Sequence, residues 1–335
     1  MASRDVVVVG ASAGGVEALK ELVAGLPADL PATVLVVLHI PASGSNALAA
    51  ILDRAGPLQA RQAQHGEPLT LGTVRVAPPD HHLLVVDDRL ALSLGPRENG
   101  HRPAVDVLFR SAARALGPRC IGVVLSGALD DGAAGMVAVR QRGGVGVVQD
   151  PDDAMQTGMP TSAIQAASPE HVLPMTQIPG LLARLAGEQV PDEVFAAPTD
   201  LMEVETAVAQ FDMSHIEGDD HPGSPAGFSC PDCSGALWSI EEGGLLRFRC
   251  RVGHAWSAES LLAQQSEALE GALWMALRSL EEKAALSRDL GRRAELDDRA
   301  LSAVRFTGLA DEAANAARLI RDLLLAPPKA DEDVG

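Results

Sequence analysis

Aliphatic runs that alternate with helical segments are the feature that most constrains the fold of this chain. The residues 5–10 (DVVVVG) and 32–39 (ATVLVVLH) are continuous runs of β-branched and aliphatic side chains, as expected of strands that are buried on both faces. Helical patterns over 14–26 and 45–53 follow these two strands. This alternation predicts an α/β fold, a doubly wound and mostly parallel sheet with right-handed crossovers.

The same alternation continues to about residue 187, with one interruption. Further strands are predicted at 120–126, 145–149 and 171–174, and further helices at 103–116, 132–141, 160–167 and 178–186. Residues 57–95 instead hold short segments separated by turn signals. They predict an antiparallel hairpin or meander at one side of the sheet, with strands near 73–77, 82–87 and 90–94.

The composition changes after residue 187. The next residues are acidic and interrupted by prolines, so we interpret them as a linker with a short helix over 199–209. Helical patterns over 258–290 and 294–326 predict a long helical hairpin or coiled coil. The predicted segments are an enzyme-like domain (1–187), a linker (188–226), a zinc-ribbon-like module (227–257), a helical hairpin (258–326) and a disordered tail (327–335).

Charge and composition exclude several classes of partner. The formal net charge of −18 argues against nucleic acid, because binding phosphates requires clustered lysines and arginines, and it disfavours an anionic membrane surface. The sequence has no run of about 18 apolar residues and no signal-peptide pattern at its start. We therefore expect a cytoplasmic protein with no membrane insertion. Aromatic residues make up only 3% of the chain, so the core must be aliphatic.

A glycine-flanked serine lies between the first predicted strand and the first predicted helix. Gly10-Ala11-Ser12-Ala13-Gly14 matches the G-x-S-x-G pattern in the strand–turn–helix context of a nucleophile elbow. The Ser12 hydroxyl would then lie at a helix N-terminus, which favours developing negative charge. A dinucleotide-binding loop is the competing interpretation. Because Ser12 replaces the middle glycine of G-x-G-x-x-G, and because the second strand ends in His39 rather than in an acid, a nucleotide-binding regulator is disfavoured.

A serine nucleophile needs a base, and the base needs an orienting acid. His39 ends the second strand, and Asp130 and Asp131 follow the strand at 120–126. Residues at the carboxyl ends of parallel strands share one edge of the sheet and can meet there. Each also has a simpler interpretation: a glycine-rich turn, a structural histidine and a helix cap formed by an aspartate. Polar residues at three strand ends together favour a hydrolase, and leave open which aspartate serves.

Several segments resemble the catalytic domain of the chemotaxis receptor methylesterase family (CheB type). They are VVVVGASAGGVEAL at 6–19, VLVVLHIP at 34–41, RPAVDVLFRSAA at 102–113, LSGALDDGAAGM at 125–136 and GMPTSAI at 158–164. The resemblance covers about residues 1–187. It implies hydrolysis of glutamate γ-methyl esters on the cytoplasmic helices of methyl-accepting chemoreceptors, with release of methanol, and deamidation of certain receptor glutamines. A non-catalytic scaffold of chemosensory signalling that keeps this fold is the alternative.

The resemblance also implies roles for individual residues. Ser12 falls on the nucleophile, His39 on the general base and Asp131 on the acid that orients the histidine. The backbone N–H groups of Ala13 and Ala128 are implied for the oxyanion hole. Ala13 stands where the family usually has threonine or serine, and Ala128 where it often has methionine. If the threonine or serine hydroxyl usual at the position of Ala13 helps to bind the oxyanion, its absence here lowers the rate of hydrolysis.

Regulated members of this family carry a phosphorylated receiver domain ahead of the esterase. In this sequence the first esterase strand begins at residue 5. We therefore expect control by aspartyl phosphorylation within the chain to be excluded, and regulation to come from elsewhere, above all from the C-terminal half.

Three cysteines and a histidine form a metal-binding pattern. Cys230-Pro-Asp-Cys233 is followed by Cys250 and, four residues later, by His254. Three thiolates and one imidazole complete a tetrahedron with no open position, so we predict a structural zinc and no cofactor for catalysis. A redox dithiol is the competing interpretation. The segment 236–249 between the ligand pairs predicts a hairpin that turns at Gly243 and Gly244.

Two further patterns lie near this module. Arg247, Arg249 and Arg251 alternate along one predicted strand, and we expect them to form a solvated face. Apolar residues at helical spacing follow, and predict either the core of the helical hairpin or a seam for self-association or for a signalling protein. They are Leu261, Leu262, Leu269, Leu273, Trp274, Leu277 and Leu280.

Overall fold

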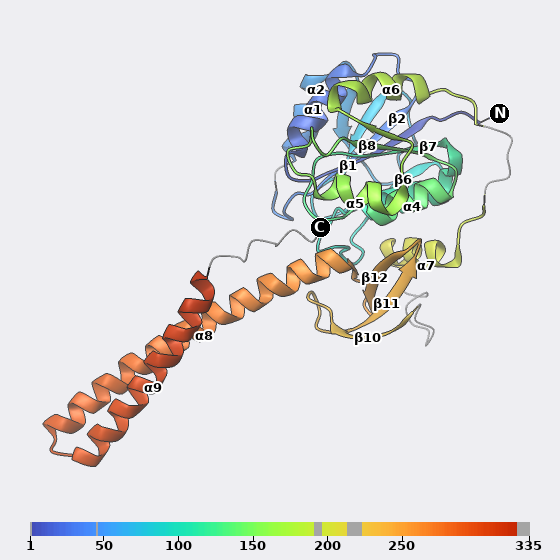
Figure 1. Cartoon of the computed structure of the whole chain (residues 1–335). Coiled ribbons are helices and arrows are strands. Elements are labelled where there is room, and N and C mark those ends of the chain that lie inside the picture. Colours follow the sequence, from blue (N-terminus) through green and yellow to red (C-terminus); the bar gives the residue numbers. More distant parts are fainter. Residues whose placement is uncertain (1, 45, 191–195, 213–222, 327–335) are drawn as a thin grey trace. The chain divides into compact units, whose positions relative to one another are not determined.

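Seven parallel strands form the sheet that organises the first 190 residues (Figure 1). They are β1 (Val6–Ala11), β2 (Thr33–Leu38), β3 (Gln59–Gln62), β4 (Thr73–Val76), β7 (Cys120–Val124), β8 (Val145–Gln149) and β9 (His171–Leu173). Their order is β3-β4-β2-β1-β7-β8-β9, so the chain reverses its direction of winding at β1. The aliphatic strands β1, β2, β7 and β8 are buried along their whole length, as their sequences predict.

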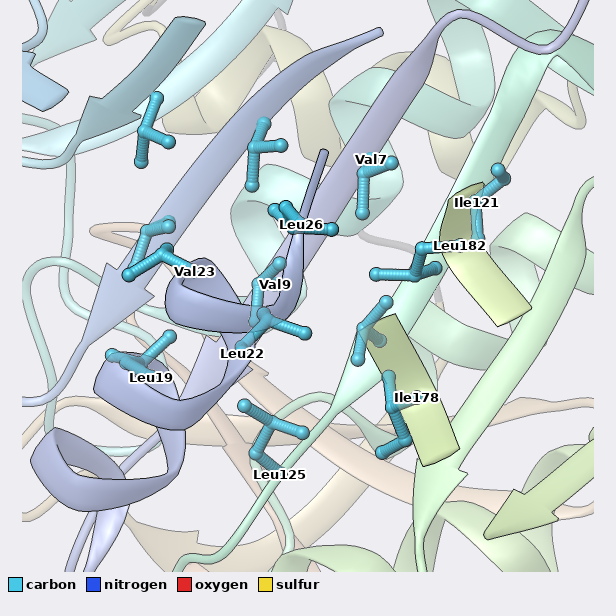
Figure 2. Packing of buried hydrophobic residues seen from close by; sticks show 14 of the residues in the cluster. Val7, Val9, Leu19, Leu22, Val23, Leu26, Ile121, Leu125, Ile178 and Leu182 are labelled. Atoms are coloured by element: carbon cyan, nitrogen blue, oxygen red, sulfur yellow. The ribbon is translucent and has the colours of Figure 1, made fainter. Parts of the chain in front are cut away.

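Helices cover both faces of the sheet, which confirms the doubly wound α/β fold. One face carries α1 (Gly15–Gly25), α2 (Ala47–Ala55) and α6 (Ile178–Leu185), and the other carries α3 (Val105–Leu116), α4 (Ala133–Gln141) and α5 (Gly158–Ala167). Figure 2 shows the first of these two cores, in which leucines of α1 pack on Val7 and Val9 of β1. Single 3₁₀ turns lie at Gly117–Arg119 and Met175–Gln177.

The structure, a computed structural model, describes residues 2–44, 46–190, 196–212 and 223–326. The chain divides into two compact units, Met1–Leu261 and Leu262–Gly335. Within the described ranges, no helix has both the length and the apolar composition needed to cross a bilayer. The tail at 327–335, which we predict to be disordered, lies outside the described residues.

The interruption between residues 57 and 95 differs from its prediction. Only β5 (His82–Val86) and β6 (Arg89–Ser93) form an antiparallel hairpin. The segment expected as a third antiparallel strand is β4, which instead extends the parallel sheet beside β2, with Val36 opposite Val76. The edge strand β3 was not predicted, because its sequence QARQ carries no apolar run.

The helix expected inside the linker is α7 (Asp200–Ala209), and it packs into the first unit. The Thr199 side chain caps it by accepting a hydrogen bond from the N–H of Met202 at 3.2 Å. Met202 joins the core beneath α3, and the Glu205 side chain is fully buried. This segment therefore contributes buried surface to the first unit, which its acidic, proline-rich surroundings in the sequence do not indicate.

A second, antiparallel sheet follows within the same unit. Its strands are β10 (Ser224–Ser229), β11 (Ala236–Glu242), β12 (Leu245–Cys250) and β13 (Ala255–Ser257), in that order. The hairpin between β11 and β12 turns at Gly243 and Gly244, as predicted, and both have the positive φ that glycine adopts without strain. Trp256 fills the small core of this sheet.

Two long helices, α8 (Ala258–Leu296) and α9 (Ala300–Leu325), confirm the predicted hairpin, and nearly all of it lies in the second unit. The seam between the helices is made mainly of small residues, and of the predicted apolar stripe in this unit only Leu277 is buried in it. Leu262 and Leu269 are 66% and 62% exposed, so they do not form the hairpin core. The buried seam residues include Ala284, Ala294, Ala303, Ala310, Ala313 and Ala317.

Candidate active site

Ser12 directly follows β1, at the carboxyl edge of the sheet where the winding reverses. The turn after it is tight: the Ser12 carbonyl accepts a hydrogen bond from the N–H of Gly15 at 2.8 Å. Gly14 has φ +76°, a left-handed conformation that only glycine adopts readily. An added Cβ at Gly14 would also lie 2.7 Å from the Ser126 hydroxyl oxygen. Backbone conformation and space therefore both require glycine here, and the turn presents Ser12 beyond the end of its strand.

The second strand brings His39 beside Ser12. The N–H of His39 donates to the carbonyl of Ala11 at 3.1 Å, which continues the β1–β2 pairing by one residue. The imidazole Nδ1 then lies 3.1 Å from Ser12 Oγ. Its Nε2 lies 2.6 Å from Oδ2 of Asp131. A neutral imidazole that donates from Nε2 to the carboxylate leaves Nδ1 free to accept the serine proton.

The carboxylate of Asp131 packs against the N-terminus of α3, where free N–H groups favour a negative charge. Its Oδ2 accepts from the N–H of Val105 at 2.6 Å, and its Oδ1 accepts from the N–H of Asp106 at 3.1 Å. Burial alone would raise the pKa of the Asp131 carboxyl, but the hydrogen bond and the charge of His39 outweigh burial and hold that pKa below its usual range. Asp131 is therefore an ionised and oriented partner for His39.

The structure separates the two neighbouring aspartates that the sequence leaves equivalent. Asp131 is directed at His39, whereas Asp130 accepts hydrogen bonds from the hydroxyls of Ser257 and Ser260 at 2.6 and 2.9 Å. Burial raises the pKa of Asp130, and the two serine hydroxyls oppose that shift. Asp130 thus lies at the start of α8 and faces away from the imidazole.

Two residues that sequence reasoning missed complete the surroundings of the imidazole. The ring of His101 stacks on that of His39, with centroids 3.6 Å apart. The side-chain amide of Asn99 donates to Oδ1 of Asp131 at 3.0 Å and to Oδ2 of Asp106 at 3.1 Å. Both lie in a polar loop with no regular pattern. The one available signal was that His101 directly precedes the segment 102–113 that resembles the methylesterases.

The two predicted oxyanion-hole residues lie on the loops beside Ser12. The N–H of Ser12 itself is occupied, because it donates to the Ser126 carbonyl at 3.0 Å. Within the described ranges, the N–H groups of Ala13 and Ala128 have no backbone acceptor. Gly127 allows this approach, since an added Cβ there would lie 3.0 Å from the Ser12 Cβ. Both free amides are therefore available near the serine.

These loops border a cleft of about 690 Å³. Ser12 and His39 lie in its wall, together with Arg97 and Arg102 from the loop that also carries His101. The Arg102 guanidinium is held by Asp80, at 2.7 Å, whereas Arg97 is exposed. The cleft is thus large enough for a protein side chain, and positive charge lies at its border.

The four predicted metal ligands lie together in the second sheet. Their ligand atoms are all within 4.8 Å of one another. Cys233 Sγ is 3.6 Å from Cys250 Sγ, and His254 Nδ1 is 3.6 Å from Cys250 Sγ and 3.8 Å from Cys230 Sγ. A tetrahedral zinc with Zn–S bonds of about 2.3 Å separates its sulfurs by about 3.8 Å. The four side chains therefore fit such an ion.

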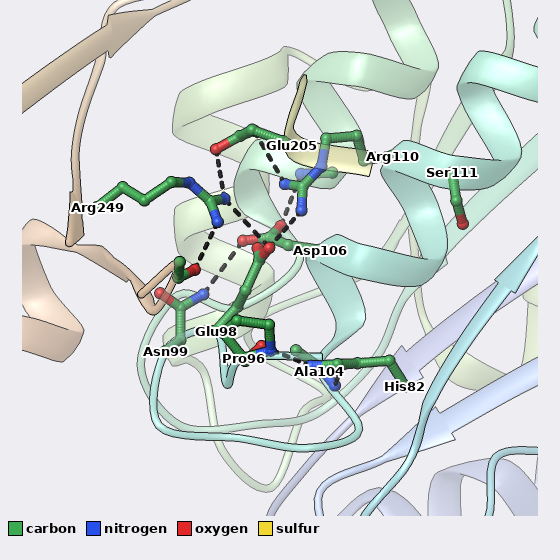
Figure 3. A network of polar contacts seen from close by, with 12 residues as sticks. His82, Pro96, Glu98, Asn99, Ala104, Asp106, Arg110, Ser111, Glu205 and Arg249 are labelled. Carbon is green, nitrogen blue, oxygen red and sulfur yellow. Dashed lines mark hydrogen bonds and ion pairs between the residues drawn. The ribbon is translucent and has the colours of Figure 1, made fainter. Parts of the chain in front are cut away.

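The neighbouring arginines do not form the solvated face that we predict for them. Arg247 and Arg249 are buried, and both bind Glu205 of α7, at 2.9 and 2.7 Å. Arg249 also binds Glu98 at 3.2 Å, and Glu98 is bound at 2.6 Å by Arg110 of α3 (Figure 3). The prediction was wrong because Glu98 and Glu205, the buried carboxylates that pair with both arginines, come from distant parts of the chain. Only Arg251 is exposed.

The fold and this geometry define the class of protein: an α/β domain with a Ser-His-Asp arrangement of the kind found in serine hydrolases. Residues 7–182 match the family model described as CheB methylesterase. Since this match covers more than half of the chain, the chain belongs to the CheB methylesterase family.

Individual relatives agree with this membership. A protein-glutamate methylesterase/protein-glutamine glutaminase of Symbiobacterium thermophilum is 40% identical over 186 residues, which cover 55% of this chain and 51% of the relative. Another of that name from Methanosarcina mazei is 39% identical over 183 residues and is covered to 50%. The chain thus spans about half the length of these two relatives. A shorter relative from Leptospira interrogans is 38% identical and covered to 94%.

A solved structure supports the same conclusion. The crystal structure of the Thermotoga maritima CheB methylesterase catalytic domain superposes with a TM-score of 0.53 at 34% sequence identity. The superposition covers all of that domain and 55% of this chain. The remaining residues, which include the second sheet and the helical hairpin, lie outside this match.

Proposed function

We propose that this chain is a protein-glutamate methylesterase that hydrolyses glutamate γ-methyl esters on the cytoplasmic helices of chemoreceptors. The observation that carries the proposal is the continuous contact from Ser12 Oγ through the His39 ring to Asp131, at 3.1 and 2.6 Å. The names of the relatives support the reaction class. The cleft beside Ser12, with Arg97 at its border, suits a substrate side chain that becomes a carboxylate.

The chemistry follows from the positions of these groups. Ser12 Oγ attacks the ester carbonyl carbon while His39 Nδ1 accepts the serine proton, and the carbonyl oxygen becomes an oxyanion near the N–H groups of Ala13 and Ala128. Collapse of this intermediate breaks the C–O bond, and His39 returns the proton to the leaving methanol. Asp131 orients the ring and stabilises its protonated form.

A second half-reaction restores the enzyme. Water attacks the acyl-enzyme carbonyl with His39 again as base, and releases the glutamate carboxylate and free Ser12. A glutamine amide can follow the same path with ammonia as the leaving group. This accounts for the glutaminase activity that the relatives' names include.

The test is methanol release from methylated receptor fragments. Replacing Ser12 by alanine should lower kcat on the order of 10⁶-fold, as loss of the nucleophile does in a serine protease. Ser266→Ala, in the helical hairpin, is the matched control and should keep the wild-type rate. If wild type and Ser12→Ala are equally inert, the chain is a non-catalytic scaffold that keeps the esterase fold.

We also propose that Cys230, Cys233, Cys250 and His254 bind one structural zinc ion. The mutual distances of the four ligand atoms support this assignment, and four protein ligands leave no position for a catalytic water. Native mass spectrometry of the full chain should find one zinc per chain. Cys250→Ser should lose it, whereas Cys120→Ser, at a cysteine buried alone in β7, should keep it. A wild-type chain that binds no zinc contradicts the assignment.

The exposed leucines of the helical hairpin support a further role in assembly. Side chains such as Leu262, Leu269, Leu286 and Leu319 are each more than 60% exposed. We propose that they bind a second copy of the chain or a signalling protein. Light scattering of the purified chain distinguishes the two, because self-association doubles the mass in the absence of any other protein. A Leu269→Glu, Leu286→Glu double variant should then be monomeric.

A further inference from the structure

The loop of residues 97–101 joins the catalytic residues to the metal-binding sheet. On its active-site side, Asn99 Nδ2 donates to Oδ1 of Asp131 at 3.0 Å, and His101 stacks on His39. Asn99 is 6% exposed, so this amide is a buried contact that water does not readily replace. The loop therefore contacts both His39 and Asp131, the two residues that we propose act together with Ser12.

The opposite side of the same loop pairs with β13. The N–H of Asn99 donates to the Ala255 carbonyl at 2.8 Å, and the N–H of Ala255 donates to the Arg97 carbonyl at 3.2 Å. The N–H of Ser257 donates to Oδ1 of Asn99 at 2.8 Å. The side chain of Asn99 is thus used at both ends: its oxygen is held by β13, and its NH₂ group holds Asp131.

The metal ligands adjoin this pairing in the sequence. His254 directly precedes Ala255, and the N–H of Cys250 donates to the His254 carbonyl at 3.0 Å. β13 is only three residues long, so its position depends on the ligands that precede it. A metal ion that fixes Cys250 and His254 therefore also fixes the strand that holds Asn99.

Buried charges fasten the loop to the same sheet. Glu98, one residue before Asn99, binds Arg249 at 3.2 Å, and Arg249 directly precedes the metal ligand Cys250 (Figure 3). Without Arg249, the fully buried Glu98 and Glu205 would both depend on Arg110 and on Arg247, whose nearest nitrogen is 3.8 Å from Glu98. An underpaired carboxylate in such a site is strongly unfavourable, so displacement of β12 would displace the loop.

We infer that Asn99 is a positioning residue for Asp131 and that the metal-loaded sheet holds it in place, so that filling the Cys₃His site assembles the catalytic residues. The inference rests on the proposed esterase function. Asn99 acts through Asp131: it fixes the carboxylate with Oδ2 toward His39 and does not itself reach the substrate. The second sheet then serves as an activating element of the esterase.

Two variants test the role of Asn99. Asn99→Ala loses both the oxygen that accepts from Ser257 and the donor to Asp131, whereas Asn99→Asp keeps the oxygen and places a carboxyl group against Asp131 and Asp106. Each should lower kcat about 10²-fold, with little change in KM, because the catalytic groups are misplaced while the cleft is intact. Asn315→Ala, on the exposed face of α9, is the matched control. If Asn99→Ala keeps the wild-type kcat, the inference is overturned.

A spectroscopic readout separates positioning from general folding. The proton between His39 Nε2 and Asp131, in a contact of 2.6 Å, should give a downfield proton resonance in the wild-type chain. That resonance should be lost in folded Asn99→Ala, which keeps Ser12, and should persist in Asn315→Ala. An unchanged resonance in Asn99→Ala would refute the positioning role, whatever the rate.

Metal removal tests the hold on the loop, with the wild-type chain alone. A chelator should increase amide hydrogen exchange in the peptides that cover 97–101 and 255–257, and added Zn²⁺ should restore protection. If amide hydrogen exchange in these peptides is the same with and without the chelator, the proposed coupling between the metal site and the loop is overturned. If the wild-type chain hydrolyses no ester at all, the proposed esterase function fails. Hydrogen exchange and the His39 proton resonance still test this inference in that case, because neither measurement depends on a rate of hydrolysis.

Discussion

His101 lies flat against His39, with the two imidazole rings 15° from parallel and their centroids 3.6 Å apart. Burial, followed by the charge of His39, lowers the pKa of His101 to about 4. His101 is therefore an uncharged ring at neutral pH. A neutral stacking partner limits rotation of the His39 ring without adding a second positive charge beside Asp131.

Replacing His101 by alanine should lower kcat for methanol release about 3- to 10-fold, since a stacked aromatic pair contributes about 0.5–1.5 kcal/mol. His101→Phe keeps a flat ring in the same place and should stay within about twofold of wild type. Steady-state rates on a methylated receptor fragment measure both. Equal losses in the two variants would mean that a ring nitrogen of His101, and not stacking, matters.

His82 should make the first unit sensitive to mild acid. Burial lowers its pKa to about 4, from 6.5 in the unfolded chain. Because the unfolded state takes up a proton first, the stability is present above pH 6.5 and is lost as pH falls toward 4. Between pH 7 and pH 5, wild type should lose about 2 kcal/mol more of its free energy of unfolding than His82→Gln. Urea unfolding of both proteins at the two pH values measures the difference, and parallel losses would contradict it.

Arg249 should contribute strongly to stability. Arg249→Met leaves Glu98 and Glu205 buried with one partner fewer, which typically costs about 3–5 kcal/mol. Arg251→Met, two residues along the chain and exposed, should change the free energy of unfolding by less than about 0.5 kcal/mol. Thermal unfolding of the full chain followed by circular dichroism compares the two. Similar values for both variants would contradict the burial of Arg249.

Gly127 should be needed for activity because nothing larger fits. A Cβ there would lie 2.0 Å from the Met159 sulfur and 3.0 Å from the Ser12 Cβ, so Gly127→Ala must push the loop that carries Ala128 away from the serine. Loss of one oxyanion donor costs about 10²–10³ in kcat. Gly180→Ala, in α6 with open space around it, should instead be fully active. Wild-type kcat in Gly127→Ala would argue against an oxyanion role for the Ala128 amide.

Much of the α/β fold could be predicted because its strands are chemically distinctive. Strands buried on both faces require continuous aliphatic runs, and 5–10 and 32–39 have them. The edge strand β3 faces fewer apolar neighbours and so carries no such run. The direction of β4 depends on pairing with β2, which is a contact between distant segments that no local pattern encodes.

The candidate site likewise contains residues that the sequence could predict and residues that it could not. Ser12, His39 and the pair Asp130 and Asp131 were predicted together because each lies at the end of a recognisable strand, and only the resemblance to the methylesterases implied Asp131 rather than Asp130. Asn99 and His101 lie in a loop whose only order comes from its neighbours, so their positions could not be foreseen. Arg249 was misassigned for a related reason: a charged residue on a strand is ordinarily solvated, and its carboxylate partners lie 44 and 151 residues away.

The burial of Glu98 between Arg110 and Arg249 has a practical consequence for dissecting this chain. A truncated fragment that ended near residue 187, close to the limit of the family match, would lack Arg247 and Arg249, two of the three arginines that pair with Glu98. It would also expose the side of the 97–101 loop that faces away from His39. Low solubility or poor turnover of such a fragment would then result from the truncation and would not describe the activity of the full chain. A C-terminal boundary placed after Leu261 keeps the 97–101 loop together with the arginines of β12 that bind Glu98.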